Sequence, residues 1–104
     1  MSLQFHGFDW DQGNWPKCGN HGVSKSEIEE LFSGVLSILP DPSHSSEETR
    51  FLGIGQISSD RWVFVAFTRR TDGERQLIRP ISARYMHQKE VQHYAQSNET
   101  KTDP

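Results

Sequence analysis

The stretch RFLGIGQISSDRWVFVAFTRRTDGERQLIRPIS, residues 50–82, decides the fold. It contains three runs rich in β-branched and aromatic residues, and turn-forming residues separate them, as is typical of neighbouring strands. We predict strands over Arg50–Ile57, Arg61–Thr68 and Glu74–Ser82. Asp72-Gly73 favours a tight hairpin between the last two, because both residues accept a positive φ. The three strands should therefore form an antiparallel meander.

Pro80 is the residue of this stretch that does not suit an ordinary inner strand. Proline has no N–H to donate to a neighbouring strand, so within sheets it occurs at edges and bulges. We therefore expect the strand Glu74–Ser82 to lie at an edge of the sheet or to contain a bulge at Pro80.

Upstream of the strands, Ser24-Lys-Ser-Glu27 has the spacing of a capping box. In this motif the serine hydroxyl and the glutamate carboxylate each bind a free backbone N–H at the start of a helix. A helix should follow, and its apolar face, spaced by three and four residues, is formed by Ile28, Leu31, Phe32, Val35 and, at its end, Leu36. Pro40 and Pro42 prevent the helix from continuing, so we expect a polar surface loop over 41–48.

The two ends of the chain complete an α+β prediction. Apolar residues alternate with polar ones over 3–10, which indicates a first short strand. A proline and a glycine within 14–20 allow only a short or irregular helix there. We predict a C-terminal helix over 83–95, one domain over 1–95, and a disordered polar tail over 96–104.

Composition indicates where the protein works. The only cysteine, Cys18, cannot form an intramolecular disulfide, which favours a reducing compartment. The chain does not open with a signal-peptide pattern. The longest unbroken apolar run, Trp62–Phe67, is far shorter than the ~20 residues that cross a bilayer. We expect a cytoplasmic protein without a membrane partner, a metal ion or a cofactor.

Charge is divided unevenly along the chain. Residues 1–49 contain eight acidic and two basic side chains, whereas residues 50–104 contain nine basic and six acidic ones. The formal net charge of −3 argues against indiscriminate binding to nucleic acid, but the second half could present a basic face. The acidic first half either is solvated or meets a basic partner.

Five arginines gather on the predicted hairpin and just after it: Arg69, Arg70, Arg75, Arg79 and Arg84. Guanidinium groups bind phosphate through paired N–H donors and keep their charge at physiological pH. The cluster therefore fits phosphate binding, although a solvated strand face would show the same composition.

His21 stands immediately before the capped helix, in Gly19-Asn-His21-Gly22. A histidine in such a place acts as a proton carrier in some enzymes and as a hydrogen-bonded structural residue in many other proteins. Trp10, Trp15 and Trp62 leave a similar choice, since tryptophans stack on unpaired bases or pack in a core.

A series of short motifs runs in order along residues 5–94. It consists of Phe8-Asp-Trp10-Asp11, Asn14 with Lys17, His21-Gly-Val-Ser24, Arg50-Phe51, Gly53-Ile-Gly55, the strand Trp62–Thr68, Arg79-Pro-Ile-Ser-Ala-Arg84, and Glu90 with Tyr94. None of these motifs is specific alone, but the ordered series resembles the BrnT toxin family. The resemblance implies an α+β, RelE-like small domain that has an antiparallel sheet, N-terminal helices and a C-terminal helix.

The resemblance also implies an activity, namely that of an endoribonuclease that needs no metal ion. In such an enzyme the 2′-hydroxyl of RNA attacks the adjacent phosphate, and the protein stabilises charge and transfers protons. Among the matching residues, Arg50, Arg79 and Arg84 would hold the phosphate, and His21 would carry the proton. We assign binding of the RNA strand to Lys17, Arg69, Arg70 and Lys89.

The partners that the resemblance implies are an RNA substrate and a BrnA-like antitoxin. Antitoxins of that kind bind DNA through a ribbon-helix-helix and cover the toxin, so the complex represses its own operon. Contact with DNA would then be only indirect.

Two positions depart from the family pattern and support an alternative function. Asn20 stands where the family usually has a basic residue, and Pro80 stands where it usually has an aliphatic one. The alternative is a catalytically inactive BrnT-like binding module that acts through partner contact and operon regulation. A stand-alone RNA-binding domain is a third interpretation.

Overall fold

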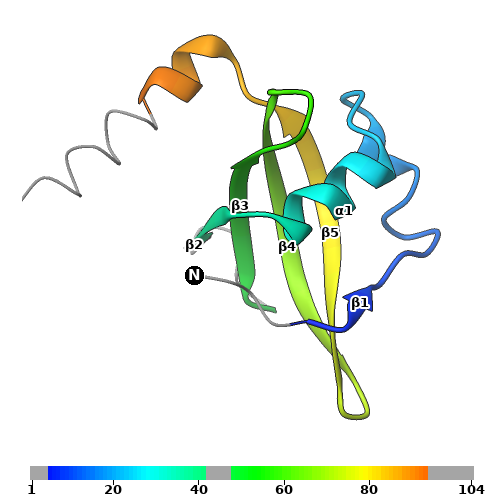
Figure 1. The fold of residues 1–104 in the computed structure, drawn as a ribbon. Coiled ribbons are helices and arrows are strands. Elements are labelled where there is room, and N and C mark those ends of the chain that lie inside the picture. Colours follow the sequence, from blue (N-terminus) through cyan, green and yellow to red (C-terminus); the bar gives the residue numbers. More distant parts are fainter. Residues whose placement is uncertain (1–4, 42–47, 94–104) are drawn as a thin grey trace, which may run out of the picture.

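One five-stranded sheet forms the frame of the computed structural model, which describes residues 5–41 and 48–93 (Figure 1). The elements are β1 (Gly7–Phe8), the 3₁₀ helix η1 (Lys17–Gly19), α1 (Lys25–Ser33), β2 (Leu36–Pro40), β3 (Arg50–Gln56), β4 (Trp62–Asp72) and β5 (Arg75–Tyr85). Residues 88–93 are also helical. The strand order is β1-β5-β4-β3-β2, and α1 lies over one face of the sheet (Figure 1). The predicted α+β class is confirmed.

The three predicted central strands are confirmed as β3, β4 and β5, which pair antiparallel. The hairpin between β4 and β5 is longer than predicted, and its last pair is Asp72 with Arg75. Gly73, at φ 64°, and Glu74 therefore form the turn, one position later than the predicted Asp72-Gly73. Glycine suits this position because residues that carry a side chain rarely adopt a positive φ.

β5 contains the bulge that Pro80 predicts. Phe67 pairs with Pro80 and Ala66 pairs with Ser82, so Ile81 is an extra residue on β5. The alternative of an edge position is wrong, because β5 lies between β1 and β4. The bulge shifts the pattern of faces along β5 by one residue.

The start of α1 agrees with the predicted capping box. The Ser24 Oγ accepts from the Glu27 backbone N–H at 3.1 Å, and the Ser24 backbone N–H donates to the Glu27 Oε1 at 2.9 Å. The predicted end of the helix is wrong, since α1 stops at Ser33 and Gly34 continues in an extended conformation. Leu36–Pro40 forms β2, which pairs antiparallel with β3.

The loop predicted over 41–48 lies mostly outside the described residues, which omit 42–47. Asp41 at its start is buried, so the prediction of a surface residue is wrong there. Its backbone N–H donates to the Arg50 carbonyl at 2.9 Å. The sheet pairing thus extends one residue past β2.

The N-terminal part departs from a purely antiparallel sheet. β1 pairs parallel with β5 through Gly7 with Leu77 and Phe8 with Ile78, so the sheet is mixed. Of the predicted N-terminal helices, the described residues contain α1 and the three-residue η1. η1 is short, as the sequence predicts. Residues 3 and 4 of the predicted first strand lie outside the described part.

The C-terminal helix begins later than predicted. Residues 83–85 belong to β5, because Ala83 and Tyr85 pair with the buried Val65 and Val63, and the helical residues start at 88. Residues 94 and 95, and the predicted tail over 96–104, lie outside the described residues. The domain limits therefore stay a prediction. None of the helices in the described residues has the length and hydropathy that a membrane crossing requires.

The core lies between α1 and the sheet. A Cβ on Gly55 would stand 2.7 Å from the Leu31 Cδ1 and 3.1 Å from the Val35 carbonyl oxygen, so a larger residue here would force the Leu31 side chain and the backbone after α1 to shift. Phe67 is fully buried at the centre. Its ring packs edge-on against Phe32 at 4.9 Å and is stacked on Phe51 at 5.6 Å between centroids. This packing fixes the sheet whose other face carries the candidate site.

Candidate active site

Arginines gather on the face of the sheet that points away from α1. Val63, Val65 and Phe67 of β4 belong to the core under α1, so the alternate residues Phe64, Ala66, Thr68 and Arg70 point to the opposite face. The strand register then places five arginines on that side. We call it the arginine face and define it by Arg50, Arg70, Arg75, Arg79 and Arg84. Of these, Arg75 pairs with Asp72 at the hairpin turn and lies outside the candidate phosphate site, which the other four arginines form.

The bulge at Ile81 is what brings Arg79 and Arg84 to the same face. These residues are five positions apart, and in a regular strand an odd separation places two side chains on opposite faces. The extra residue restores the match, because Arg79 pairs with Thr68 and Arg84 pairs with Phe64. All three arginines that the sequence assigns to the phosphate therefore share one face.

Arg50, Thr68 and Arg79 form one row across three strands. Two strand spacings put the outer Cα atoms ~10 Å apart, a distance that two arginine side chains can close. Thr68 between them is only 3% exposed, and within the described residues its Oγ1 has no hydrogen-bond partner. A buried hydroxyl without a partner is rare in folded proteins and often marks a functional position.

Arg79 is held by the loop that follows β1. Its Nη1 and Nη2 donate to the two carboxylate oxygens of Asp11 at 3.0 Å each, and Nη1 also donates to Asp9 at 3.3 Å. The hydrogen bond from Arg79, followed by that from the Gly13 N–H, lowers the pKa of Asp11. Asn14 is buried and fastens this loop to β5, since its Nδ2 donates to the Pro80 carbonyl at 2.9 Å. The guanidinium of Arg79 is therefore fixed in place.

Arg84 is held in a similar way by the C-terminal helical segment. Its Nη1 and Nη2 donate to the two carboxylate oxygens of Glu90 at 2.7 and 2.8 Å. The guanidinium also lies over the Phe64 ring, 4.8 Å from the ring centroid. This bidentate pair leaves the Nε–H of Arg84 for another acceptor.

The pH dependence of this ion pair gives a direct test. The Arg84 hydrogen bonds, followed by that from the His87 N–H, lower the pKa of Glu90 from 4.5 to about 2. A lowered carboxylate pKa stabilises the fold above the unfolded pKa, and this contribution disappears as the pH falls from 4.5 to about 2.

We therefore expect Glu90→Gln to unfold at lower denaturant concentration than the wild type near neutral pH. This gap between the two unfolding midpoints should close towards pH 2. Chemical denaturation at several pH values measures this gap. Glu74→Gln in the exposed turn is the matched control and should show no gap at any pH. A gap for Glu90→Gln that stays constant down to pH 2 would contradict the assignment.

His21 lies at the far end of β5 from the Arg50–Thr68–Arg79 row. The carbonyl of the next residue, Gly22, is 3.5 Å from the Tyr85 hydroxyl, and His21 itself is exposed. This is the end of β5 at which Arg84 stands. The Tyr85 side chain points to the α1 side, because Tyr85 pairs with the core residue Val63 and its hydroxyl binds Glu27 of α1. The segment of His21 therefore lies at the Arg84 end of β5 but contacts the α1 side of the sheet, whereas Arg84 points to the arginine face.

At that end of β5 a cluster of three side chains, Glu27, Arg61 and Tyr85, was not predicted from the sequence. The Tyr85 hydroxyl donates to the Glu27 Oε1 at 2.7 Å, and the Arg61 guanidinium stacks on the Tyr85 ring at 3.3 Å. The hydrogen bond from the Ser24 N–H, followed by that from Tyr85, lowers the pKa of Glu27. Glu27 had a complete explanation as a capping residue, and Tyr85 stood in a predicted helix, so neither gave a signal.

The four residues assigned to binding the RNA strand are spread around the molecule. Arg70 is on the arginine face and pairs with Glu48, Nε to Oε2, at 2.8 Å. Arg69 points to the α1 side of the sheet. Lys17 on η1 and Lys89 in the helical segment 88–93 are both exposed.

Cys18 and the acidic residues show no metal site. Burial raises the pKa of the Cys18 thiol to about 11. Over 5–41 and 48–93, no three His, Cys, Asp or Glu side chains gather in a way that could hold a metal ion.

A helix on one face of a mixed sheet and arginines on the other define a small α+β domain suited to binding phosphate groups. Its sequence matches, over residues 10–90, the family described as "Ribonuclease toxin, BrnT, of type II toxin-antitoxin system". The chain belongs to the BrnT family. A search of curated proteins gave no match.

Membership of this family gives the broad function. The chain is a ribonuclease toxin of a type II toxin–antitoxin system, with RNA as its target and an antitoxin as its partner. The matched region includes Asp11, His21, all five arginines of the arginine face, and Glu90.

Proposed function

We propose that this toxin cleaves RNA without a metal ion, through attack of a ribose 2′-hydroxyl on the adjacent phosphate. The bond from phosphorus to the 5′-oxygen breaks, and the protein supplies charge stabilisation and proton transfer. One observation carries the proposal: Arg50 and Arg79 share the arginine face, and the bulge at Ile81 places Arg84 on the same face. Fixed guanidinium groups stabilise the charge that develops on a phosphate in the transition state.

The register suggests separate tasks for these arginines. The row of Thr68 and the row of Phe64 are four residues apart on β4, or ~13 Å, so Arg84 and Arg79 would contact different phosphates. We assign Arg84 to the phosphate that is cut. Arg50 and Arg79 would hold a neighbouring phosphate on either side of Thr68.

His21 and Arg84 belong to the same end of β5, although the Gly22 contact is with Tyr85, on the side of the sheet opposite the arginine face. An imidazole is the usual proton carrier near neutral pH. We propose that RNA bends around this end of the sheet, so that the phosphate bound by Arg84 comes within reach of His21, which takes the proton of the 2′-hydroxyl or returns one to the leaving oxygen.

The ion pairs on the arginine face set the strength of RNA binding. Asp11, Glu48 and Glu90 neutralise Arg79, Arg70 and Arg84 in the absence of RNA, so a phosphate must compete with carboxylates. Lys17 and Lys89 would add contacts at the periphery. This competition fits a protein of net charge −3 that does not bind nucleic acid indiscriminately.

We further propose a BrnA-like antitoxin with a ribbon-helix-helix as the partner, and a RelE-like relationship of the fold. DNA contact would then come only through the antitoxin. The match to a ribonuclease family does not favour the alternative of an inactive binding module. Pull-down of the toxin with the product of the adjacent gene tests the choice of partner.

Cleavage of a defined RNA by the purified full chain tests the main proposal. We expect cleavage that persists in excess EDTA and leaves a 2′,3′-cyclic phosphate, which mass spectrometry identifies. A substrate with a single 2′-deoxy nucleotide at the cut position should stay intact, because it lacks the attacking hydroxyl. Cleavage of that substrate, or complete inhibition by EDTA, would overturn the mechanism.

A further inference from the structure

We propose that a cleft on the α1 side of the sheet, beside the base of the β4–β5 hairpin, binds one nucleotide of the RNA. This inference rests on the proposed function, since it takes RNA as the ligand, but it concerns a place outside the arginine face. The cleft has a volume of about 420 Å³ and is lined by Glu48, Thr49, Phe51, Arg69 and Gln76. This volume is within the range of small-molecule sites.

Arg69 is the cation of this cleft. It pairs with Ile78 across the hairpin and so points to the side on which Phe67 and α1 lie. Among the described residues, the guanidinium has no carboxylate or other hydrogen-bond partner, whereas Arg70, Arg79 and Arg84 each pair with a carboxylate. The described part of the chain thus leaves all five N–H donors of Arg69 to a phosphate.

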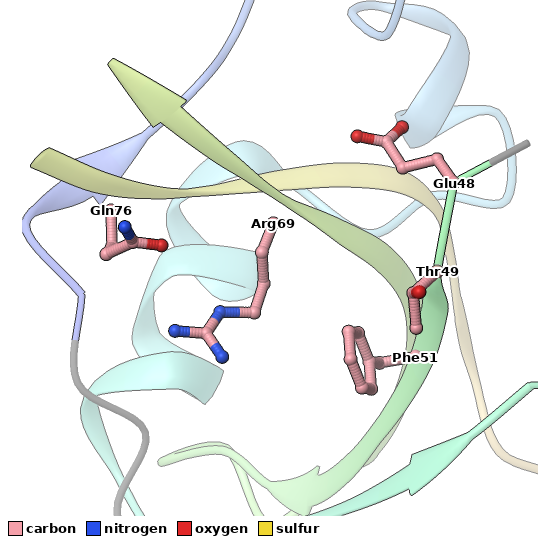
Figure 2. A pocket seen from close by; sticks show the side chains of 5 residues that line it. All are labelled: Glu48, Thr49, Phe51, Arg69 and Gln76. Atoms are coloured by element: carbon pink, nitrogen blue, oxygen red, sulfur yellow. The ribbon is translucent and has the colours of Figure 1, made fainter. Parts of the chain in front are cut away.

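Phe51 provides an aromatic surface next to that cation. One side of its ring is stacked on the Phe67 ring, which holds it in place, and the residue is only half-buried. Figure 2 shows the Phe51 ring and the Arg69 guanidinium directed into the same space. A flat ring beside a guanidinium matches the two parts of a nucleotide, because bases stack on aromatic rings and phosphates bind arginine.

Polar groups complete the lining. The Gln76 side chain enters from β5, and its Nε2 donates to the Thr71 hydroxyl at 3.3 Å, so the amide oxygen stays available to a donor (Figure 2). The Glu48 carboxylate would repel a phosphate, but it is bound to Arg70 on the other side of β4. An acidic peptide would use Arg69 alone and leave the ring and the amide without a role. The lining therefore favours a nucleotide.

The cleft adjoins the arginine face at the edge of β4. β3 begins at Arg50, which pairs with Thr68, so Arg69 and Arg70 extend beyond β3 and point to opposite sides of the hairpin. One RNA strand that crosses this edge could contact both. The cleft would then hold a nucleotide outside the phosphates on the arginine face.

Titration of the full chain with adenosine 5′-monophosphate, followed by NMR, tests the inference. This mononucleotide has no internucleotide bond to cut, so the result does not depend on catalysis and is independent of the RNA cleavage assay. We expect saturable shifts of the Gln76 side-chain amide and the Phe51 ring signals. Adenosine without phosphate, and inorganic phosphate alone, should each bind more weakly.

The matched variants are Arg69→Gln and Arg75→Gln, which change two exposed arginines of the same hairpin on opposite faces. Arg69→Gln should weaken binding by about tenfold, as for the loss of one charged hydrogen bond, and Arg75→Gln should leave it unchanged. Equal binding by the wild type and Arg69→Gln would overturn the proposal. Shifts at Gln76 that appear with an acidic peptide and not with the nucleotide would also overturn it, in favour of a protein partner.

Discussion

Replacement of Arg84 by alanine should lower kcat for RNA cleavage by about 100- to 1000-fold, the usual cost of losing one fixed donor to a transition-state charge. Arg84 is the arginine that we place at the cut phosphate, and Glu90 holds its guanidinium through two hydrogen bonds. Because those bonds fix the group before RNA arrives, little reorganisation is needed during the reaction. The rate should therefore fall more than the affinity for RNA.

Single-turnover cleavage at saturating protein separates the two effects. Arg75→Ala is the matched control, since Arg75 is on the same strand and face but lies outside the proposed phosphate sites. Arg84→Lys keeps the charge and loses the bidentate geometry, so we expect it to recover only part of the rate. A folded Arg84→Ala variant that cuts RNA at the wild-type rate would remove Arg84 from the mechanism.

Phe67→Ala should lower the free energy of unfolding by about 3–5 kcal/mol, the range measured for removal of a buried aromatic ring. Phe67 has no exposed surface and contacts both Phe32 of α1 and Phe51 of β3. Small domains are stable by only ~5–15 kcal/mol, so this single change removes a large part of the total. Urea denaturation of the variant and the wild type gives the difference.

Val35→Ala is the control for that measurement, because Val35 is 90% exposed and also carries an aliphatic side chain. It should change the unfolding midpoint very little. The two variants together separate loss of core packing from loss of hydrophobic surface in general. A midpoint for Phe67→Ala equal to that for Val35→Ala would contradict the placement of Phe67 in the core.

Short sequence patterns were enough to predict α1, β3 and β4. The capping box at Ser24 fixed the start of α1, and the apolar runs around Phe51 and Phe67 fixed β3 and β4. β2 was missed because Leu36 continues the helical spacing of the preceding residues, and only pairing with β3 makes Leu36–Pro40 a strand. Strand formation depends on such distant partners more than on intrinsic preference. The same reason explains the parallel pairing of β1 with β5.

The site was predictable in composition but not in arrangement. The arginines were visible in the sequence, whereas their faces depend on a register that the bulge at Ile81 changes. Their carboxylate partners were equally hidden, because Asp11 is 68 residues away from Arg79 along the chain. Arg84 and Glu90 are six residues apart, and they meet only because the chain turns from β5 into a helix after Tyr85.

The bulge has a consequence for how this sequence can diverge. In a relative whose strands pair without an extra residue, the counterparts of Arg79 and Arg84 would need to be four or six positions apart, instead of five, to stay on one side. Gain or loss of one residue in Pro80-Ile-Ser-Ala83 is thus tolerable only if the bulge is lost or a second bulge is added. Alignments that close a one-residue gap in this segment by sliding the sequence would equate an arginine of the arginine face with a core position.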